Sequence, residues 1–306
     1  MKRFKRILLV VDRPNPSRST LARTVNLARR NGASLTLFEV LSPTTSLKNL
    51  DACSAELSTA DDFYGCADSE EISLAGIDFR VHMGTGDVWS ETIREVLAGS
   101  HDLVVKSIPP DGCLGVTEEN LMRRCPCPVW ILKGCQDPFS SILAAVDLEG
   151  DDHNRVALNR TILELASSLA ALEGARLHVV HAWSLFGEET YRGPRINLPR
   201  RQLAQLLRQT REEKQVNLDA LLASVSFSGV EPEVDLRKGN PAEVIATVAG
   251  EAHADLIVMG TVSRTGIAAF LFENMSEIVT ERVECSVLTV RPWGSTGAEE
   301  RESHDS

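Results

Sequence analysis

The chain alternates between short, continuous apolar runs and longer segments in which leucine and alanine recur every three or four residues. The clearest continuous runs are Ile7–Val11, Leu103–Val105, Ile142–Val146 and Leu256–Met259. Such runs are typical of parallel strands that are covered by helices on both faces. The segment 199–224, with Leu203, Leu207, Leu218 and Leu222, shows helical spacing and predicts an amphipathic helix.

The same succession of elements occurs twice. An apolar run ending at Asp12 matches one ending at Asp147, and the strand after Asp102 matches the strand after Asp255. The offset between matched positions grows from 135 to 153 residues. The second copy therefore has about 18 additional residues, which we assign to a longer first helix and to a loop around 185–200. The closing strands also match: Val129–Leu132 and Val287–Val290.

Each copy is predicted to be a doubly wound, Rossmann-like α/β domain with a parallel five-stranded sheet. Helix starts carry capping residues, Asp87 in the first copy and Asn240 before Pro241 in the second. The predicted domains are residues 1–136 and 139–292. The remaining residues, 293–306, are rich in Gly, Ser and Glu and predict a disordered tail.

The amino-acid composition of the chain excludes several classes of function. With 43% hydrophobic residues the chain can form two cores, and its formal charge of −11 argues against nucleic acid or anionic lipid as a partner. No stretch reaches the length of a membrane span, and Ile7–Val11 is too short for a signal peptide. We expect a cytoplasmic protein. The seven cysteines contain no CxxC pair, so we expect reduced thiols and no metal site.

Candidate chemistry lies after the strands of the second copy, because open parallel sheets bind ligands at the carboxyl ends of their strands. The loop after the fourth strand contains glycines, which let backbone N–H groups approach a phosphate, and it leads into a helix start. The candidate ligand-binding residues are Asp147, His181, Met259, Gly260, Thr261, Ser263, Arg264, Gly266, Asn274, Met275 and Ser276.

These residues, the closing strands and the segment Arg124–Ile131 resemble the universal stress protein family, in its tandem-domain type. The resemblance covers about residues 4–292. Members that bind ATP carry the pattern G-x2-G-x9-G-[S/T] in this loop. Carried over here, Gly260 fits the first glycine, whereas Ser263 and Glu273 replace the other two and Asn274 replaces the hydroxyl residue. The resemblance thus implies an ATP or AMP site that Ser263 and Glu273 disfavour.

Glu273 is the stronger obstacle. A carboxylate at roughly 4 Å from a phosphate charge costs about 4 kcal/mol at an effective dielectric constant near 20, or nearly three decades of affinity. The corresponding loop of the first copy contains Pro109 and Pro110, which lack N–H donors, and Lys106 stands where we place the counterpart of Gly260. We expect the first copy not to bind nucleotide.

Other polar and aromatic residues are predicted to be structural. His101 and His253 are expected at the surface, and His178 and His181 on opposite faces of one strand. The tryptophans at 89, 130 and 183 are expected in packing roles. A group of arginines is expected on a solvated helix face, with phosphate or partner binding as the alternative: Arg200, Arg201, Arg208 and Arg211.

No G-x-S-x-G, HExxH or GxGxxG motif is present, and no catalytic residue is assigned. The resemblance favours a non-enzymatic stress-response protein with a structural or docking first domain and a degenerate ligand pocket in the second. The alternatives are an ATP/AMP-binding module with switch or slow ATPase behaviour, and a binder of an apolar or lipid-like molecule. The two domains are expected to pack as a pseudo-dimer through Val129–Leu132 and Val287–Val290, with a homodimer or a protein partner also open.

Overall fold

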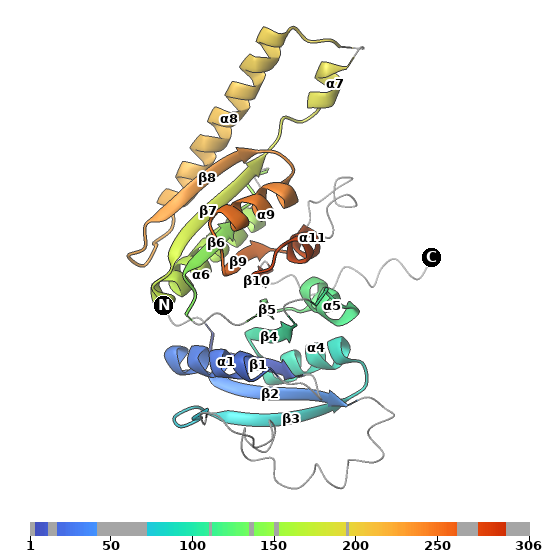
Figure 1. Cartoon of the computed structure of the whole chain (residues 1–306), viewed down its shortest axis with the longest axis vertical. Coiled ribbons are helices and arrows are strands. Elements are labelled where there is room, and N and C mark those ends of the chain that lie inside the picture. The colour runs from blue at the N-terminus through green and yellow to red at the C-terminus, as the bar shows by residue number, and fades with distance from the viewer. Residues whose placement is uncertain are drawn as a thin grey trace. The chain divides into compact units, whose positions relative to one another are not determined.

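A computed structural model describes residues 4–11, 17–41, 72–109, 112–134, 138–149, 153–193, 196–261 and 275–291. The chain divides into two compact units (Figure 1). Unit 1 contains residues 1–137 together with 284–306, and unit 2 contains residues 138–283. The chain therefore leaves unit 1, forms unit 2 and then returns to unit 1. The predicted tail, 293–306, lies outside the described residues.

Unit 1 is built on a parallel sheet with the strand order β3-β2-β1-β4-β5. This order reverses direction between β1 and β4, as in a doubly wound α/β fold. Its elements are β1 (Arg6–Val11), α1 (Arg18–Asn31), β2 (Ser34–Leu41), β3 (Phe79–Thr85), α4 (Val88–Gly99), β4 (Leu103–Ile108), α5 (Val116–Arg124), β5 (Val129–Lys133) and β10 (Ser286–Val290).

Helices cover both faces of the unit 1 sheet, because its strands alternate buried apolar side chains between the two sides. Leu8 and Val10 of β1 belong to a core cluster with Val96 of α4 and Leu121 of α5. Local sequence sets the helix ends. The Asp87 side chain accepts a hydrogen bond from the Ser90 N–H at the start of α4, which confirms the predicted cap.

The free edge of β5 is covered by β10, which runs antiparallel to it. Leu288 lies opposite Trp130, and the Thr289 hydroxyl donates to the Val129 carbonyl at 3.1 Å. The backbone N–H of Lys133 donates to the Ser286 hydroxyl at 3.2 Å. The two closing-strand segments that the sequence predicted to meet are therefore paired, and the last strand of the second repeat is part of unit 1.

Unit 2 repeats the parallel order as β9-β6-β7-β8. Helices α6 and α8 contact one another on one face of this sheet, and α9 and α11 contact one another on the other (Figure 1). The elements are β6 (Ser141–Ala145), α6 (His153–Glu173), β7 (Arg176–Trp183), α7 (Glu188–Arg192), α8 (Arg200–Ala223), β8 (Pro232–Lys238), α9 (Pro241–Glu251), β9 (Leu256–Gly260) and α11 (Met275–Arg282).

The additional residues of the second copy lie in helices. Helix α6 has 21 residues where α1 has 14, and α8 has 24. The segment around 185–200 is not only a loop, because it contains the short helix α7, whose Glu188 is paired with Lys238 at 2.6 Å. The Asn240 side chain accepts from the N–H groups of Ala242 and Glu243, as its capping role predicted.

No helix in the described part of the chain is long and apolar enough to cross a membrane. The two longest helices illustrate why. Helix α6 alternates apolar residues with Asn, Arg and Glu, and α8 carries charged residues along much of its length.

We predict that β10 contributes to the stability of unit 1 as a core strand. Leu288 is fully buried, so Leu288→Ala should lower the free energy of unfolding by about 2–5 kcal/mol in urea titrations. The matched control is Leu97→Ala in α4, where the side chain is 61% exposed and the change should stay within about 0.5 kcal/mol. Equal effects of the two substitutions would contradict a core role for β10.

Candidate ligand site at the carboxyl ends of the unit 2 strands

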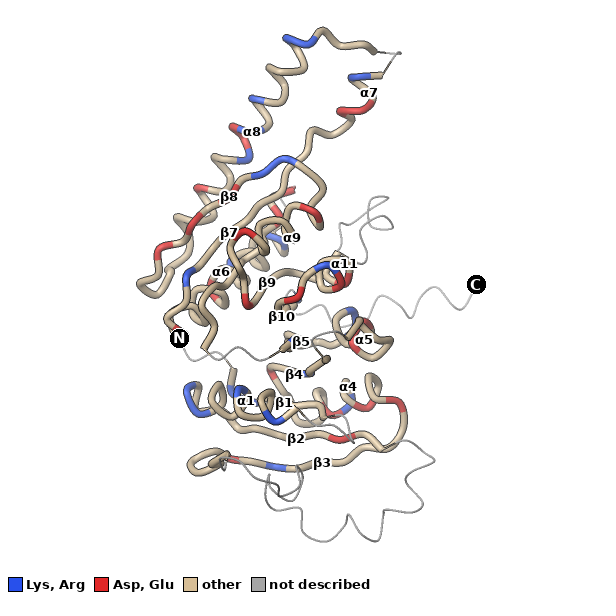
Figure 2. Tube along the Cα trace, in the orientation of Figure 1, with Lys and Arg blue, Asp and Glu red and all other residues tan. Residues whose placement is uncertain are grey.

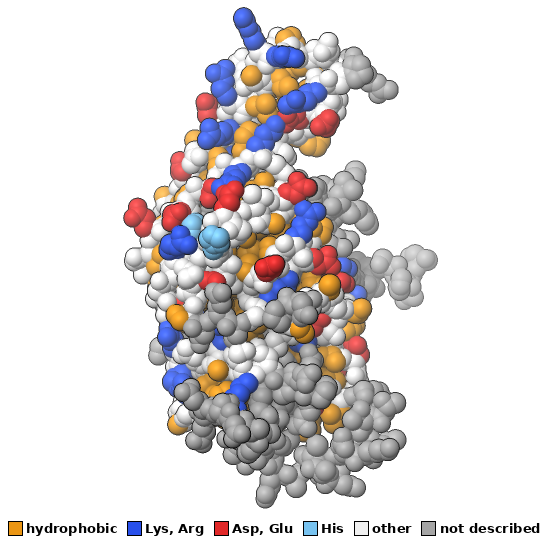
Figure 3. Space-filling view, viewed as in Figure 1, with side chains coloured by type: hydrophobic (Ala, Val, Ile, Leu, Met, Phe, Trp, Pro, Cys, Tyr) orange, Lys and Arg blue, Asp and Glu red, His pale blue; other side chains and the backbone are white. Residues whose placement is uncertain are grey.

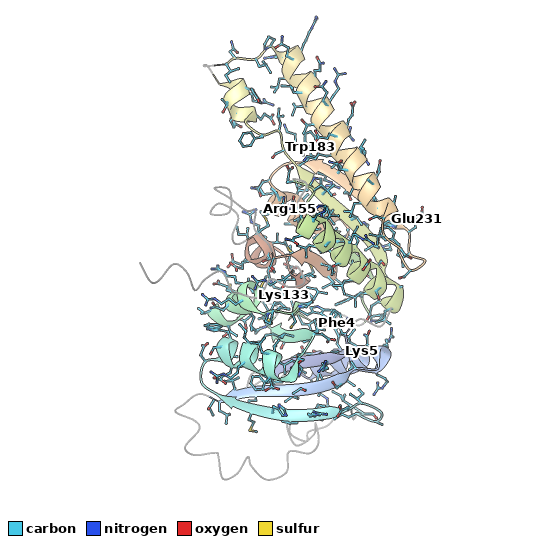
Figure 4. All side chains as sticks on the ribbon, turned by 180° about the vertical axis from the view of Figure 1, so that it is seen from behind. Phe4, Lys5, Lys133, Arg155, Trp183 and Glu231 are labelled. Carbon is cyan, nitrogen blue, oxygen red and sulfur yellow. The ribbon has the colours of Figure 1, made fainter. Side chains whose placement is uncertain are left out.

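The candidate site lies where the strand order of unit 2 reverses. Strand β6 lies between β7 and β9, and Ala145 at its end is level with Val180 on one side and Met259 on the other. Asp147 follows β6, Thr261 follows β9, and His181 lies two residues before the end of β7, so the topology brings the three to one edge of the sheet. Figure 4 shows Arg155, at the start of α6, and Trp183, at the end of β7, near this edge.

Asp147 is held by its own neighbours. Its backbone N–H donates to the Asn159 side-chain oxygen at 3.1 Å, and Asn159 in turn donates to the Asp147 carbonyl at 2.6 Å. The Asp147 carboxylate accepts from the Glu149 N–H at 3.0 Å and lies 3.6 Å from an Arg155 nitrogen. Because α6 begins only at His153, Asp147 is not its N-cap, and the carboxylate stays half-exposed at the strand end.

His181 is buried beneath the site, with 1% of its surface exposed. Its Nδ1 donates to the Val146 carbonyl at 3.0 Å, since a carbonyl oxygen can only accept. Burial lowers the pKa of His181, and the hydrogen bond to Val146 and the carboxylates of Asp147 and Glu149 oppose that shift. The ring is therefore neutral near pH 7. Its Nε2 has no hydrogen-bond partner among the described residues.

Lys214 is a part of this edge that sequence reasoning missed. It projects from α8, is 8% exposed, and pairs with Glu149 at 3.2 Å. The signal was present in the sequence, because Lys214 occupies the inward stripe of α8 between Leu207 and Leu218. A cation at an inward helical position requires a buried partner. Helix α8 is thus attached to the loop that follows Asp147.

Gly260 has a packing role. A Cβ atom at Gly260 would lie 2.8 Å from the Leu158 Cδ2 atom and 3.6 Å from the Ile162 Cδ1 atom, both in α6. Strand β9 therefore needs glycine at its end to approach α6, whatever ligand is present. Next to it, Met259 is 3% exposed, and the Thr261 hydroxyl is buried without a partner among the described residues.

Helix α11 brings Met275 and Ser276 into unit 2. Ser276 is 5% exposed, and its carbonyl accepts from the Thr280 hydroxyl. The remaining candidates lie outside the described residues: Ser263, Arg264, Gly266 and Asn274, together with Glu273. Their roles stay predictions.

The same edge of unit 1 is occupied by a buried ion pair. The Lys106 ammonium of β4 lies 3.4 Å from the Glu118 carboxylate of α5, and the two side chains are 3% and 9% exposed. Glu118 also accepts from the Gly115 N–H at 3.0 Å, so its carboxylate lies at the N-terminus of α5, where the helix dipole favours a negative charge. A carboxylate of the protein itself thus fills the position at which a helix start could bind an anion.

The strand register gives the counterparts of this pair in unit 2. Ile7 of β1 is level with Leu103, and the equivalent Ile142 of β6 is level with Leu256. Lys106 therefore corresponds to Met259, not to Gly260 as the sequence comparison placed it. Aligning the closing strands places Glu118 opposite Ser276. The lysine of unit 1 is thus replaced by methionine in unit 2, whereas a buried carboxylate, Glu277, follows Ser276 in the first turn of α11.

Two of the histidine predictions differ in outcome. His101 was expected at the surface, but it is 9% exposed, and its Nε2 lies 3.1 Å from the Thr36 hydroxyl. The sequence did not indicate this burial, because His101 precedes a strand and its partner Thr36 is distant in the sequence. His253 is exposed, as predicted. His178 contacts Glu233 at 3.7 Å, whereas His181 contacts Val146, in agreement with opposite faces.

Among the described residues, two tryptophans and two cysteines are buried. Trp130 is 2% exposed and Trp183 5%, while Trp89 lies under the Arg124 guanidinium at 5.1 Å. The Cys125 and Cys127 sulfur atoms are buried 3.6 Å apart as free thiols. Within the described ranges, no three His, Cys, Asp or Glu side chains are grouped so that they could hold a metal ion.

Comparison with known proteins agrees with the resemblance. The sequence model of the universal stress protein family matches the chain twice, over residues 3–133 and 138–291. The chain belongs to the universal stress protein family. The chain therefore contains two universal stress protein domains in tandem, and residues 284–291 at the end of the second match form part of unit 1.

Relatives of similar length share this arrangement. Universal stress protein E of Salmonella typhi is 28% identical over 311 residues, which cover 95% of this chain and 96% of that protein. Universal stress protein E of Escherichia coli K12 is 27% identical over 311 residues, covering 95% of each. The predicted similarity to the tandem type is confirmed.

Solved structures support the fold alone. A universal stress protein structure from Pseudomonas aeruginosa UCBPP-PA14 aligns with a TM-score of 0.65 at 23% identity, over 95% of both chains. A universal stress protein from Archaeoglobus fulgidus aligns with a TM-score of 0.58 at 18% identity, over 94% of this chain and 98% of that one.

We predict that Lys106 and Glu118 are energetically coupled. Lys106→Met introduces the residue that unit 2 carries at this position, but it leaves the Glu118 carboxylate buried without this cation and should cost about 3–5 kcal/mol of unfolding free energy. The double variant Lys106→Met/Glu118→Gln should recover most of that loss, because no unpaired charge remains. If urea titrations show that the two single losses simply add, the coupling is absent.

We predict that His181 makes the protein less stable as the pH falls. Since burial lowers its pKa in the folded state, the unfolded chain binds the proton more tightly, and stability is lost as the pH falls below about 6.5. His181→Asn keeps a donor for the Val146 carbonyl and should flatten the dependence of unfolding free energy on pH between about pH 7 and 5. The control His153→Asn, at the exposed start of α6, should leave the slope unchanged. An unaltered slope in His181→Asn would refute the assignment.

Proposed function

We propose that this chain is a non-enzymatic stress-response protein in which the two domains have different tasks. Unit 2 provides a ligand pocket at the carboxyl ends of β6, β7 and β9. Unit 1 is the structural and docking half. Membership of the universal stress protein family supports the class of protein, and the different residues at equivalent positions support the division of tasks.

The observation that carries this proposal is the Lys106–Glu118 pair and its absence from unit 2. In unit 1, Glu118 satisfies both Lys106 and the Gly115 N–H, so a bound anion would have to displace it. In unit 2, Met259 takes the place of Lys106, so the buried carboxylate at the start of α11, Glu277, has no lysine at the equivalent strand position. There His181 Nε2 and the Thr261 hydroxyl are buried without described partners, and a bound molecule would give them one.

The pocket of unit 2 is expected to accept a neutral or weakly charged molecule in preference to a triphosphate. Asp147 and Glu149 contribute carboxylates at its edge, and Glu273 would add a third in the loop after β9. Lys214 and Arg155 are already paired with these acids, so little positive charge is left for a phosphate chain. An apolar or lipid-like molecule would need no additional positive charge from the pocket, and it is therefore compatible with these side chains.

An ATP- or AMP-binding module with switch or slow ATPase behaviour is the second candidate. It is motivated by Gly260, which fits the first glycine of the family pattern, and by Gly266, Asn274 and Ser276 in the loop and helix start that follow. The packing of Gly260 against Leu158 gives that glycine an independent reason, so the candidate depends on the rest of the loop. The two domains are expected to act as a pseudo-dimer in the cytoplasm, with a protein partner or a second copy also open.

Mass spectrometry of the purified, denatured chain identifies any small molecule that it carries. The proposal predicts no stoichiometric ATP or AMP, and calorimetry with added ATP should show no micromolar binding. Stoichiometric co-purified ATP, or a micromolar dissociation constant, would overturn the degenerate-pocket assignment in favour of the nucleotide module.

Loop variants separate the two candidates. Ser263→Gly/Glu273→Gly should strengthen ATP binding by up to about three orders of magnitude, since it removes a carboxylate near the phosphates. The control Glu231→Gln removes an equal charge just before β8, at a distance from Trp183 in Figure 4, and should leave binding unchanged. Strong binding by the unchanged chain that the double variant does not improve would refute the electrostatic argument.

A further inference from the structure

Helix α8 has two sharply different faces. Its inward stripe consists of residues at helical spacing that are buried or half-buried: Leu203, Leu207, Thr210, Lys214, Leu218 and Leu221. The opposite side is a line of exposed residues with the same spacing: Arg201, Gln205, Arg208, Glu212, Val216, Asp219 and Ala223. We call this line the outer face of α8. Val216 within it is 66% exposed.

Charge on the outer face is divided by sign. Its first half carries Arg201 and Arg208, and its second half carries Glu212 and Asp219. Figure 2 shows Lys and Arg along the first half of α8 and acidic residues along the second. Within the described part of the chain, Arg201, Arg208 and Glu212 have no ion-pair partner, and Asp219 accepts a hydrogen bond from Gln215 at 2.9 Å.

The charges are also symmetric in position. Arg201 and Asp219 lie nine residues before and after Thr210, and Arg208 and Glu212 lie two residues before and after it. If two α8 helices pack antiparallel with a two-fold axis at the level of Thr210, each arginine therefore meets an acid of the other copy. Both pairs form in one register, and the symmetry produces each of them twice.

We propose that the outer face of α8 is a self-association surface, and that its occupant is the α8 helix of a second copy of this chain. The interface is isologous and antiparallel, with Arg201 opposite Asp219 and Arg208 opposite Glu212 of the other copy. This proposal is independent of the ligand proposal for unit 2. It identifies a surface and a register for the homodimer, which the family membership alone does not provide.

The geometry of α8 permits such an interface. The helix has 24 residues and is about 36 Å long, and its outer face is free of large aromatic side chains, so two helices can approach to roughly 8–10 Å. Figure 3 shows basic side chains exposed over the part of unit 2 where α8 begins. In this register the exposed Val216 is level with the exposed Ala204 of the other copy, six residues from the centre of the pair.

A second copy explains the pattern better than an acidic partner does. An acidic protein or an anionic surface would be attracted by Arg201 and Arg208 and repelled by Glu212 and Asp219. Only a partner with the reverse order of charges satisfies all four residues, and an antiparallel copy of the same helix has that order. Exposed ion pairs contribute little individually, so we expect a weak dimer that depends on protein concentration.

The test is sedimentation velocity on the full chain at micromolar to submillimolar concentration. The unchanged protein should show a concentration-dependent monomer–dimer equilibrium. Arg201→Glu/Arg208→Glu should weaken dimerisation by about tenfold or more, because all four facing pairs become repulsive. The matched control, Arg200→Glu/Arg211→Glu, makes the same charge change on exposed residues beside the outer face and should have a smaller effect.

Charge exchange distinguishes this register from a dimer that forms through another surface or in another register. Glu212→Lys/Asp219→Lys should also weaken self-association, whereas an equimolar mixture of the two double variants should form heterodimers at least as stable as the original dimer. The chain with all four charges reversed should dimerise like the unchanged protein. Circular dichroism confirms that each variant retains its helices.

Three results would overturn the proposal. The first is a protein that stays monomeric throughout the concentration range. The second is a dimer that neither double variant weakens, which would place the interface elsewhere. The third is loss of the dimer in the arginine variant without recovery in the mixture or in the fourfold reversal, which would assign the arginines to another partner, such as an acidic protein.

Discussion

The requirement that the edge of β5 be paired governs how this chain is organised. Trp130 and Ile131 of β5 are buried, and an uncovered edge beside them would expose unpaired backbone groups next to apolar side chains. Strand β10 removes that edge by pairing antiparallel with β5. Because β10 is the last strand of the second repeat, the chain returns to unit 1 after forming unit 2. Unit 1 is therefore made of two segments, one before and one after unit 2.

The two domains, which the chain joins covalently, differ in the residues at equivalent interior positions. The strand register makes Lys106 of unit 1 equivalent to Met259 of unit 2, and aligning the closing strands makes Glu118 equivalent to Ser276, which precedes the buried Glu277. Buried charges must be paired, so the two replacements depend on one another. In unit 1, the Glu118 carboxylate accepts a hydrogen bond from the Gly115 N–H at the start of α5. Unit 2 has Met259 in place of the lysine and the buried Glu277 in the first turn of α11, and the side chains of His181 and Thr261 have polar atoms without a partner among the described residues.

The sequence alone predicted much of the fold and less of the site. Continuous apolar runs identified the parallel strands, Asp87 and Asn240 marked helix starts, and the matching closing strands pointed to the β5–β10 pair. These are local signals or repeats. The Lys106–Glu118 pair and the burial of His101 depend on which residues of distant elements face each other, and no single segment records that. The local sequence around Gly260 predicted only a phosphate loop. Its packing against Leu158 was not visible there, because Leu158 lies about a hundred residues earlier in the chain.

Native-state hydrogen exchange on the full chain tests the central claim that β10 is an integral strand of unit 1. Backbone amides of Ser286–Val290 should exchange only through the same high-energy opening as those of β5 and β1, with equal free energies of exchange. Fast exchange of β10 through a separate local opening, while β5 and β1 stay protected, would contradict the account.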